Sequence, residues 1–148
     1  MYRLIAALAM AFSLNSPSLK PPEGLYRLRI SYYNPALGGT NCHPANWKDG
    51  ECTTWLYGYP WQYWIGKGAA CDNRFALGTK LYLVRLKRVV TCVDRGGAIV
   101  ALPDGTGFVD VLDNNMPWIK DWKRNIIVDK FCPSGCFWTL AYDTSELD

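Results

Sequence analysis

The sequence predicts a compact all-β domain. Three short apolar runs, LGTKLYLV (77–84), RVVTCVD (88–94) and GFVDVLD (107–113), are rich in β-branched and aromatic residues and are separated by turn-forming Gly, Asp and Pro. A chain of 148 residues has room for one such domain. Its 49% hydrophobic and 20% charged residues are typical of a globular protein.

The start of the chain is interpreted as a secretory signal over residues 1–13. A short positive start precedes the apolar run Leu4–Phe12, which is too short to span a bilayer. A buried N-terminal helix is the alternative. Residues 14–24 contain three prolines and are expected to form an extended linker, so the domain itself covers 25–148.

The first strand is expected at Leu25–Tyr33, where apolar and polar residues alternate until Asn34 and Pro35 end the run. Gly38 and Gly39 then turn the chain, and residues 40–66 show no sustained period and are interpreted as a loop.

After the three central runs, Asn114 or Asn115 can cap a short helix from Met116. Two closing strands are expected, in residues 125–131 and 137–142, around the CPSGC turn. The acidic end from Thr144 to Asp148 is expected to be frayed.

Two of the central strands carry an aspartate where packing favours an apolar residue. Alternation puts Val109 and Val111 on one face of their strand and Asp110 on the other. In the preceding strand the same rule puts Cys92 and Asp94 on one face, and Asp94 runs into a glycine-containing loop. Asp72, a third carboxylate, follows Cys71.

These residues carry a family resemblance. The segments GAACD (68–72), LGTK (77–80), DRGGAI (94–99) and FVDVL (108–112) resemble the successive motifs of the three-aspartate (3D) domain. That domain is a six-stranded double-psi β-barrel found in membrane-bound lytic transglycosylase A and in small cell-wall-cleaving proteins. The resemblance implies this fold here, with short helices and disulfide-stapled loops.

The resemblance also implies an activity, the lytic cleavage of peptidoglycan. Asp72, Asp94 and Asp110 match the three family aspartates. Asp110 would protonate the β-1,4 bond between N-acetylmuramic acid and N-acetylglucosamine, then take a proton from the muramic 6-hydroxyl to leave a 1,6-anhydro end. Asp94 and Asp72 would support it by raising its pKa and stabilising charge, although turn capping is an equal alternative for Asp72.

Further residues of the motifs are expected to contact the substrate. They are Thr79, Arg95, Gly96 and Gly97, and Lys80 or Arg95 is expected to pair with an aspartate. The sequence departs from the family in the insert 100–107, where a turn on Pro103, Asp104 and Gly105 can absorb the extra length. Within these 148 residues we expect no counterpart of the second domain that walls the glycan groove of the large transglycosylase.

The segment 40–66 is unusually aromatic. Aromatic rings stack on the C–H faces of sugars but also fill cores, and packing is favoured for any single ring. The candidates for substrate binding are Trp55, Tyr57, Trp61 and Trp64, of which at least one should be exposed.

Six cysteines in a short chain predict a disulfide framework and an oxidising compartment, either secreted, periplasmic or at the cell wall. Of the 15 possible connectivities, the preferred set joins Cys42 to Cys52, Cys71 to Cys92 and Cys132 to Cys136. A structural zinc is the alternative, but the chain has no CxxC pair and one histidine, so no metal or other cofactor is expected.

The charge pattern limits the partners. A net charge of +3 without a basic stripe argues against nucleic acid. We expect a monomer that acts on peptidoglycan or another β-1,4-linked glycan. We expect no membrane span after the signal is removed. Two other functions stay open: an inverting endo-β-1,4-glycan hydrolase, with Asp72 or Asp94 as base, and a non-catalytic, expansin-like cell-wall binding module.

Overall fold

The computed structural model describes residues 24–35, 42–113, 127–129 and 132–145. The expected signal segment, nearly all of the linker, the turn at Gly38-Gly39 and the helix from Met116 lie outside these residues. Within the described part, no helix is long and apolar enough to cross a membrane.

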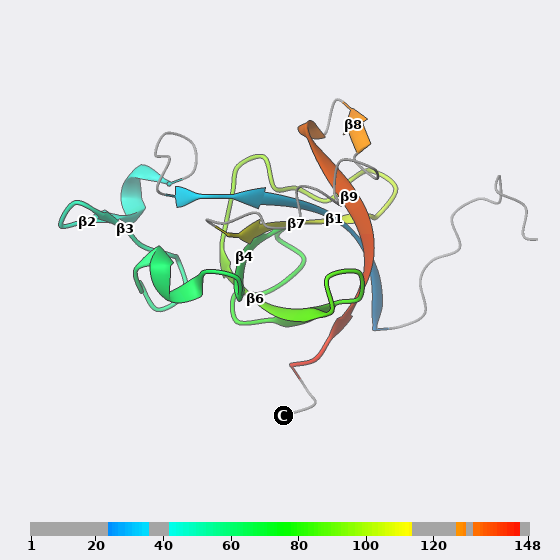
Figure 1. Cartoon of the computed structure of the whole chain (residues 1–148), viewed down its shortest axis with the longest axis horizontal. Coiled ribbons are helices and arrows are strands. Elements are labelled where there is room, and N and C mark those ends of the chain that lie inside the picture. Colours follow the sequence, from blue (N-terminus) through cyan, green and yellow to red (C-terminus); the bar gives the residue numbers. More distant parts are fainter. Residues whose placement is uncertain (1–23, 36–41, 114–126, 130–131, 146–148) are drawn as a thin grey trace, which may run out of the picture.

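Six strands close into a mixed barrel, in agreement with the all-β prediction (Figure 1). They are β1 (Leu25–Tyr33), β4 (Gly68–Cys71), β5 (Lys80–Leu83), β6 (Arg88–Asp94), β7 (Gly107–Leu112) and β9 (Cys132–Asp143). The order is β1-β7-β4-β6-β5-β9, and β9 pairs back onto β1. The pairs β1–β7 and β4–β6 are parallel and the other four are antiparallel.

The barrel interior is apolar because inward residues alternate along each strand. Val109 and Val111 share a face, as the alternation predicted, and both are fully buried inside. The Cys71–Cys92 disulfide crosses this interior and joins β4 to β6, as expected. The rest of the barrel core consists of Leu28, Ile30, Ala69, Phe75, Leu81, Leu83, Val90, Phe137 and Ala141.

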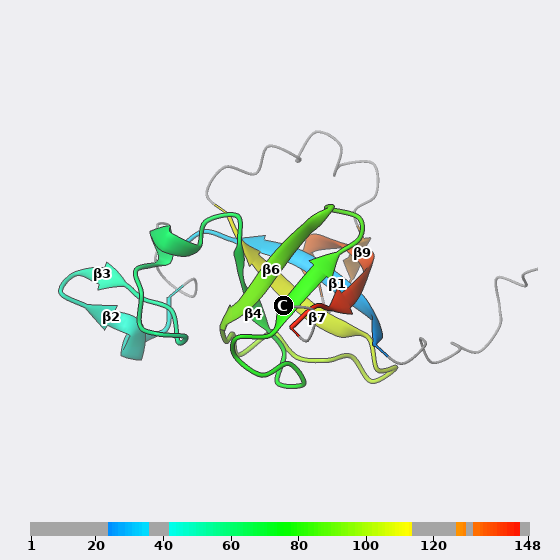
Figure 2. The same ribbon diagram turned by 90° about the horizontal axis from the view of Figure 1, so that it is seen from below.

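An arm projects from the barrel between β1 and β4 (Figure 2). This arm, residues 42–66, contains the 3₁₀ helices η3 (Pro44–Asn46) and η4 (Trp61–Trp64) and the hairpin of β2 (Trp47–Lys48) with β3 (Glu51–Cys52). It was predicted only as a loop. The expected Cys42–Cys52 disulfide closes it.

The C-terminal segment differs in detail from the prediction. Strand β8 (Ile127–Asp129) pairs with β9, but the CPSGC segment is the irregular start of β9 rather than the turn between two strands. The expected Cys132–Cys136 disulfide is present there. The predicted fraying from Thr144 is wrong at its first residues, because Thr144 N–H donates to Lys80 O (2.8 Å) and Lys80 N–H donates to the Ser145 hydroxyl (2.9 Å).

The insert between β6 and β7 forms the predicted turn. Gly105 N–H donates to Leu102 O at 2.9 Å, and Leu102 N–H donates to Thr106 O at 2.8 Å. Gly105 has φ 86°, a left-handed conformation that favours glycine. The Asp104 side chain accepts from Thr106 N–H (2.9 Å) and completes the turn. The segment between β6 and β7 is thus folded into a hydrogen-bonded turn.

Candidate functional site

Asp110 and Asp94 lie on the outer face of the barrel, on either side of Ala70. Ala70 of β4 is opposite Asp110 of β7 and opposite Asp94 of β6. Ser31 of β1 is in turn opposite Asp110. Four neighbouring strands therefore bring a row of Ser31, Asp110, Ala70 and Asp94 together. We call Asp94 and Asp110 the acid pair.

Asp94 reaches this face through an irregularity in β6. Ala69 is opposite Cys92, but Ala70 is opposite Asp94, so Val93 is an extra residue on β6. A bulge of this kind re-aims the side chain that follows it. Cys92 points into the barrel core, whereas Asp94 bonds outside it. The prediction that Cys92 and Asp94 share a face is wrong for this reason.

The Asp94 carboxylate accepts three hydrogen bonds. The Tyr33 hydroxyl donates to Oδ2 at 3.0 Å, and Arg95 N–H donates to Oδ1 at 3.0 Å. The backbone N–H of Trp55, from the arm, is the third donor. Burial raises the pKa of Asp94, while these three bonds and the nearby His43 oppose the rise because they stabilise the anion.

Asp110 has a different environment. The Ser31 hydroxyl donates to its Oδ1 at 2.8 Å. Protein atoms surround the carboxyl group densely, yet the residue keeps partial contact with solvent. Burial raises the pKa of Asp110 from 3.8 to about 7, the hydrogen bond from Ser31 opposes this rise, and the charge of Asp94 adds to it. The group can therefore hold a proton near neutral pH.

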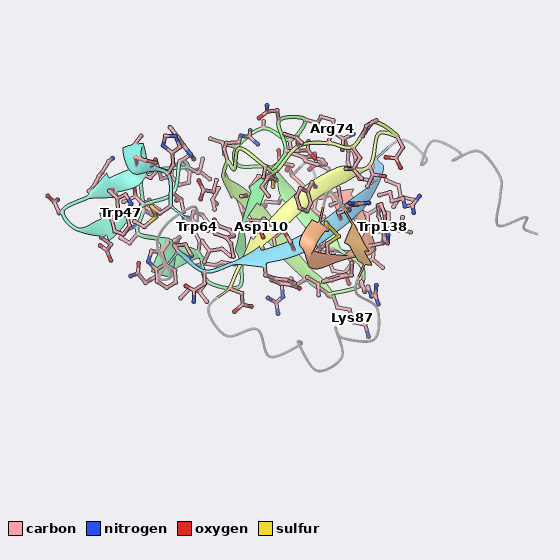
Figure 3. The ribbon with its side chains drawn as sticks, turned by 90° about the horizontal axis from the view of Figure 1, so that it is seen from above. Trp47, Trp64, Arg74, Lys87, Asp110 and Trp138 are labelled. Atoms are coloured by element: carbon pink, nitrogen blue, oxygen red, sulfur yellow. A yellow bond between two sulfur atoms is a disulfide. The ribbon has the colours of Figure 1, made fainter. Side chains whose placement is uncertain are left out.

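Two apolar clusters enclose Asp110 on the outer face. Its strand neighbour Leu112 belongs to an arm-side cluster, and its other neighbour Phe108 packs with Cys132 and Cys136. The partly buried Ile99 contacts both clusters. The arm-side cluster consists of Tyr33, Cys42, Cys52, Trp61, Trp64, Ala70, Val93 and Leu112. Figure 3 shows Asp110 between Trp64 on the arm side and Trp138 on the opposite side.

The glycines after Asp94 have separate roles. A Cβ at Gly96 would come within 2.7 Å of the Ile99 side chain, so glycine is what allows Ile99 to lie close. A Cβ at Gly97 would meet nothing within 4 Å, and Gly97 is exposed. Gly96 therefore supports the packing beside the acid pair, while Gly97 leaves its backbone open to solvent.

Asp72 is held in a separate network. It is 1% exposed, and its carboxylate accepts from Phe108 N–H (2.7 Å) and from the backbone N–H of Arg74 (3.0 Å). The Arg74 guanidinium pairs with it at 3.1 Å. Arg74 was missed in the sequence, where Lys80 or Arg95 was expected as the cation. These contacts fit the turn-capping alternative for Asp72.

The Arg95 guanidinium is also used structurally. It donates to the carbonyl oxygens of Cys71 (3.0 Å), Asp72 (3.0 Å) and Phe75 (2.7 Å). Thr79 uses its backbone, since its carbonyl accepts from Cys92 N–H at 2.8 Å. Both residues therefore stabilise the backbone beside β6. In the described hydrogen bonds, neither side chain contacts Asp94 or Asp110.

The four aromatic candidates divide into two kinds. Trp55 and Tyr57 are 44% and 70% exposed, whereas Trp61 and Trp64 are 9% and 8% exposed and belong to the arm-side cluster. Trp61 and Trp64 therefore pack the arm onto the barrel and do not present a face to a ligand. The backbone N–H of Trp55 donates to Asp94, which attaches this exposed residue directly to the acid pair.

Several residues of the site were missed in the sequence. Ser31 and Tyr33 are two residues apart in the predicted first strand, so the sequence placed them on one face but did not give their partners. The single histidine, His43, was considered only as a metal ligand. Among the described residues, no group of three or more His, Cys, Asp and Glu side chains could hold a metal ion.

Comparisons with known proteins add no name to this site. A scan against protein-family models matched none, and searches of curated proteins and of solved structures found no match.

Proposed function

We propose that the chain is a glycan-cleaving enzyme of the cell wall, a peptidoglycan lytic transglycosylase. The observation that carries the proposal is the acid pair, in which Asp110 has a pKa of about 7 and keeps partial contact with solvent. Strongly raised carboxyl pKa values are concentrated at catalytic sites, because a general acid must be protonated near the working pH. The closed mixed barrel, with its parallel pairs β1–β7 and β4–β6, also supports a double-psi assignment.

In the proposed mechanism Asp110 acts twice. Its proton passes to the glycosidic oxygen as the bond from C1 of N-acetylmuramic acid breaks. The resulting carboxylate then accepts the proton of the muramic 6-hydroxyl as that oxygen bonds to C1. The products are a free 4-hydroxyl on N-acetylglucosamine and a 1,6-anhydro end, so no water is consumed and Asp110 ends protonated.

Asp94 is assigned the role of the ionised partner. It accepts three hydrogen bonds that stabilise its anion, whereas Asp110 has one from Ser31. Asp94 therefore loses its proton first, and its charge favours the protonated form of Asp110. The same charge would stabilise the positive charge that develops at C1. Asp72 takes no part in this chemistry and maintains the β4–β7 junction.

An inverting glycan hydrolase is the second candidate, and the strand spacing favours it specifically. Asp94 and Asp110 are on strands separated by β4, so their backbones lie about 10 Å apart at ~4.8 Å per strand. Inverting enzymes hold their two carboxyl groups roughly 6.5–9.5 Å apart around a water, and retaining ones hold them at about 5–5.5 Å. In this reading Asp94 would be the base.

Product mass separates these candidates. The oxidised protein is incubated with murein sacculi, and the soluble fragments are weighed by mass spectrometry. Transglycosylation gives anhydro products that are one water lighter than the hydrolysis products. Hydrolysis products would reject the first candidate in favour of the second. Binding to sacculi without released fragments would reject both and leave the non-catalytic glycan-binding module, for which the exposed Trp55 and Tyr57 are the supporting observation.

Export of the protein is part of the proposal. The three disulfides are compatible with an extracellular or periplasmic location, because such bonds persist in oxidising compartments. We propose secretion, directed by residues 1–13, and action as a monomer. Detection of the processed protein outside the cytoplasm, with size measurement in solution, tests both.

A further inference from the structure

Three exposed tyrosines form a continuous row on the arm. Tyr57, Tyr59 and Tyr63 are 70%, 43% and 53% exposed. The ring centroids are 5.3 Å apart between Tyr57 and Tyr59 and 5.0 Å apart between Tyr59 and Tyr63. Beneath them lies the buried Trp64, stacked on Tyr59 and edge-on to Tyr63. We call these three residues the tyrosine ladder, and the buried indole holds two of its rings in place.

The backbone at Tyr57 is strained. Tyr57 has φ 61° and is followed by Gly58 with φ 63°, at the tip of a turn in which Thr54 N–H donates to Tyr59 O at 2.9 Å. The left-handed region is unfavourable for a non-glycine residue, because its Cβ comes too close to the following carbonyl oxygen. Because the Tyr57 ring is exposed, burying it does little to offset the cost of this backbone conformation. Packing alone therefore does not account for a tyrosine at this position. Strain of this kind at an exposed aromatic points to ligand contact.

Positive charge accompanies the ladder. The Lys67 ammonium lies 3.9 Å from the centre of the Tyr63 ring. The Lys48 ammonium lies beside the Tyr57-Gly58 turn, 3.4 Å from where a Cβ of Gly58 would be. Glu51 is opposite Lys48 in the hairpin, and its negative charge offsets that of Lys48, which makes Lys67 the principal cation. The surface therefore combines flat rings with a cation.

We propose that the tyrosine ladder is a second glycan-binding surface, which holds an anionic cell-wall polysaccharide chain outside the acid pair. The choice of polymer rests on the proposed function. Sugar rings present C–H faces that pack on aromatic faces, and the centroids of neighbouring ladder rings are 5.0–5.3 Å apart, so the three rings can contact adjacent parts of one chain. Lys67 would pair with a carboxylate of the polymer. A protein partner is the competing occupant.

The test measures binding without catalysis. Asp110→Asn protein is mixed with murein sacculi that have been stripped of protein, and the fraction that sediments gives the affinity. In that background, replacing all three tyrosines by alanine should weaken binding by about tenfold or more, because three aromatic contacts to the polymer are lost. Lys67→Gln should reduce the salt dependence of the binding.

Tyr57→Asn is the sharper variant. Asparagine tolerates the left-handed region better than tyrosine, so the melting temperature should hold or rise while binding falls about threefold or more. Tyr142→Thr, which removes another exposed tyrosine from strand β9, is the matched control and should bind unchanged. A drop with Tyr142→Thr equal to that of the ladder variants would overturn the proposal.

Two further outcomes would reject it. Folded ladder variants that bind the stripped sacculi as tightly as the parent exclude the surface from glycan binding. Sedimentation with untreated cell envelopes but not with stripped sacculi indicates a protein partner instead. Since the readout is binding by an Asp110→Asn protein, a wild-type chain that releases no fragments would refute the proposed catalysis and leave this result standing.

Discussion

Asp94 and Asp110 are both opposite Ala70, one from each neighbouring strand. Ala70 is buried in the arm-side cluster, so the short side chain between the two acids is covered, while the flanking strands fix the direction of each acid. The two carboxyl groups differ in their donors, with three hydrogen bonds to Asp94 and one to Asp110. This asymmetry is the basis of the predictions below.

Asp110→Asn should abolish glycan cleavage while the fold is kept. Asparagine is nearly isosteric and can still accept from Ser31, but it cannot deliver a proton. General acid catalysis contributes typically 10²- to 10⁴-fold, so fragment release from sacculi should fall by at least that much. Asp49→Asn, at an exposed turn with φ 51°, is the matched control and should keep full activity. A fully active Asp110→Asn protein would remove Asp110 from the mechanism.

The wild-type protein should lose stability relative to Asp110→Asn as pH rises from about 4 to 7. The pKa of Asp110 is 3.8 when unfolded and about 7 when folded, so the folded state binds more protons in this window. The contribution of Asp110 to the free energy of unfolding is therefore largest below pH 4 and is lost as the pH rises through 7. The difference should reach at most about 4 kcal/mol. Denaturant unfolding of both proteins at several pH values measures it, and parallel curves would show that the Asp110 pKa is not raised.

Ile99→Ala should lower the pKa of Asp110. Ile99 contacts both apolar clusters beside the acid, and opening this contact admits water that stabilises the carboxylate. The alkaline limb of the activity profile should move down by roughly one pH unit. Val100→Ala, which truncates an exposed neighbour, should leave the profile unchanged. If the alkaline limb stays in place for a folded Ile99→Ala protein, the packing by Ile99 does not set the Asp110 pKa.

Asp72→Asn should destabilise the protein without changing the pH profile of activity. Asp72 is buried and accepts two backbone N–H bonds, and weakening hydrogen bonds to a charged group costs about 1.5–3 kcal/mol. Arg74→Gln should be milder, because the arginine side chain is 40% exposed. Thermal unfolding gives the stability, and activity is measured below the melting transition. A shifted pH profile in the folded variant would place Asp72 in the catalytic chemistry.

Alternation made much of the barrel predictable from the sequence. It gave the strands around Ile30, Val90 and Val109 and placed Asp110 on the face opposite Val109, because a two-residue period follows directly from side-chain burial. The disulfide pairs were also predicted correctly, each joining cysteines close in sequence or on motif strands.

Long-range pairing was what the sequence could not supply. The extra residue Val93 turns Asp94 to the outer face, and such a bulge depends on strand β4 rather than on local pattern. The Ser31–Asp110 hydrogen bond joins two parallel neighbouring strands that are far apart in the sequence. In the arm, the Asp49-Gly50 dipeptide was an available hairpin signal, while the burial of Trp61 and Trp64 required the barrel to pack against.

The arm leaves and rejoins the barrel around one strand end. Gly66 N–H donates to Leu112 O at 2.9 Å, and Asp113 N–H donates to Tyr33 O at 3.1 Å, so the last residue of β1 and the last of the arm flank the same end of β7. Insertions whose two ends lie close together are readily exchanged. Natural variation or grafting could thus replace the whole arm as a cassette, and change the surface beside the acid pair while the acid-bearing strands keep their arrangement.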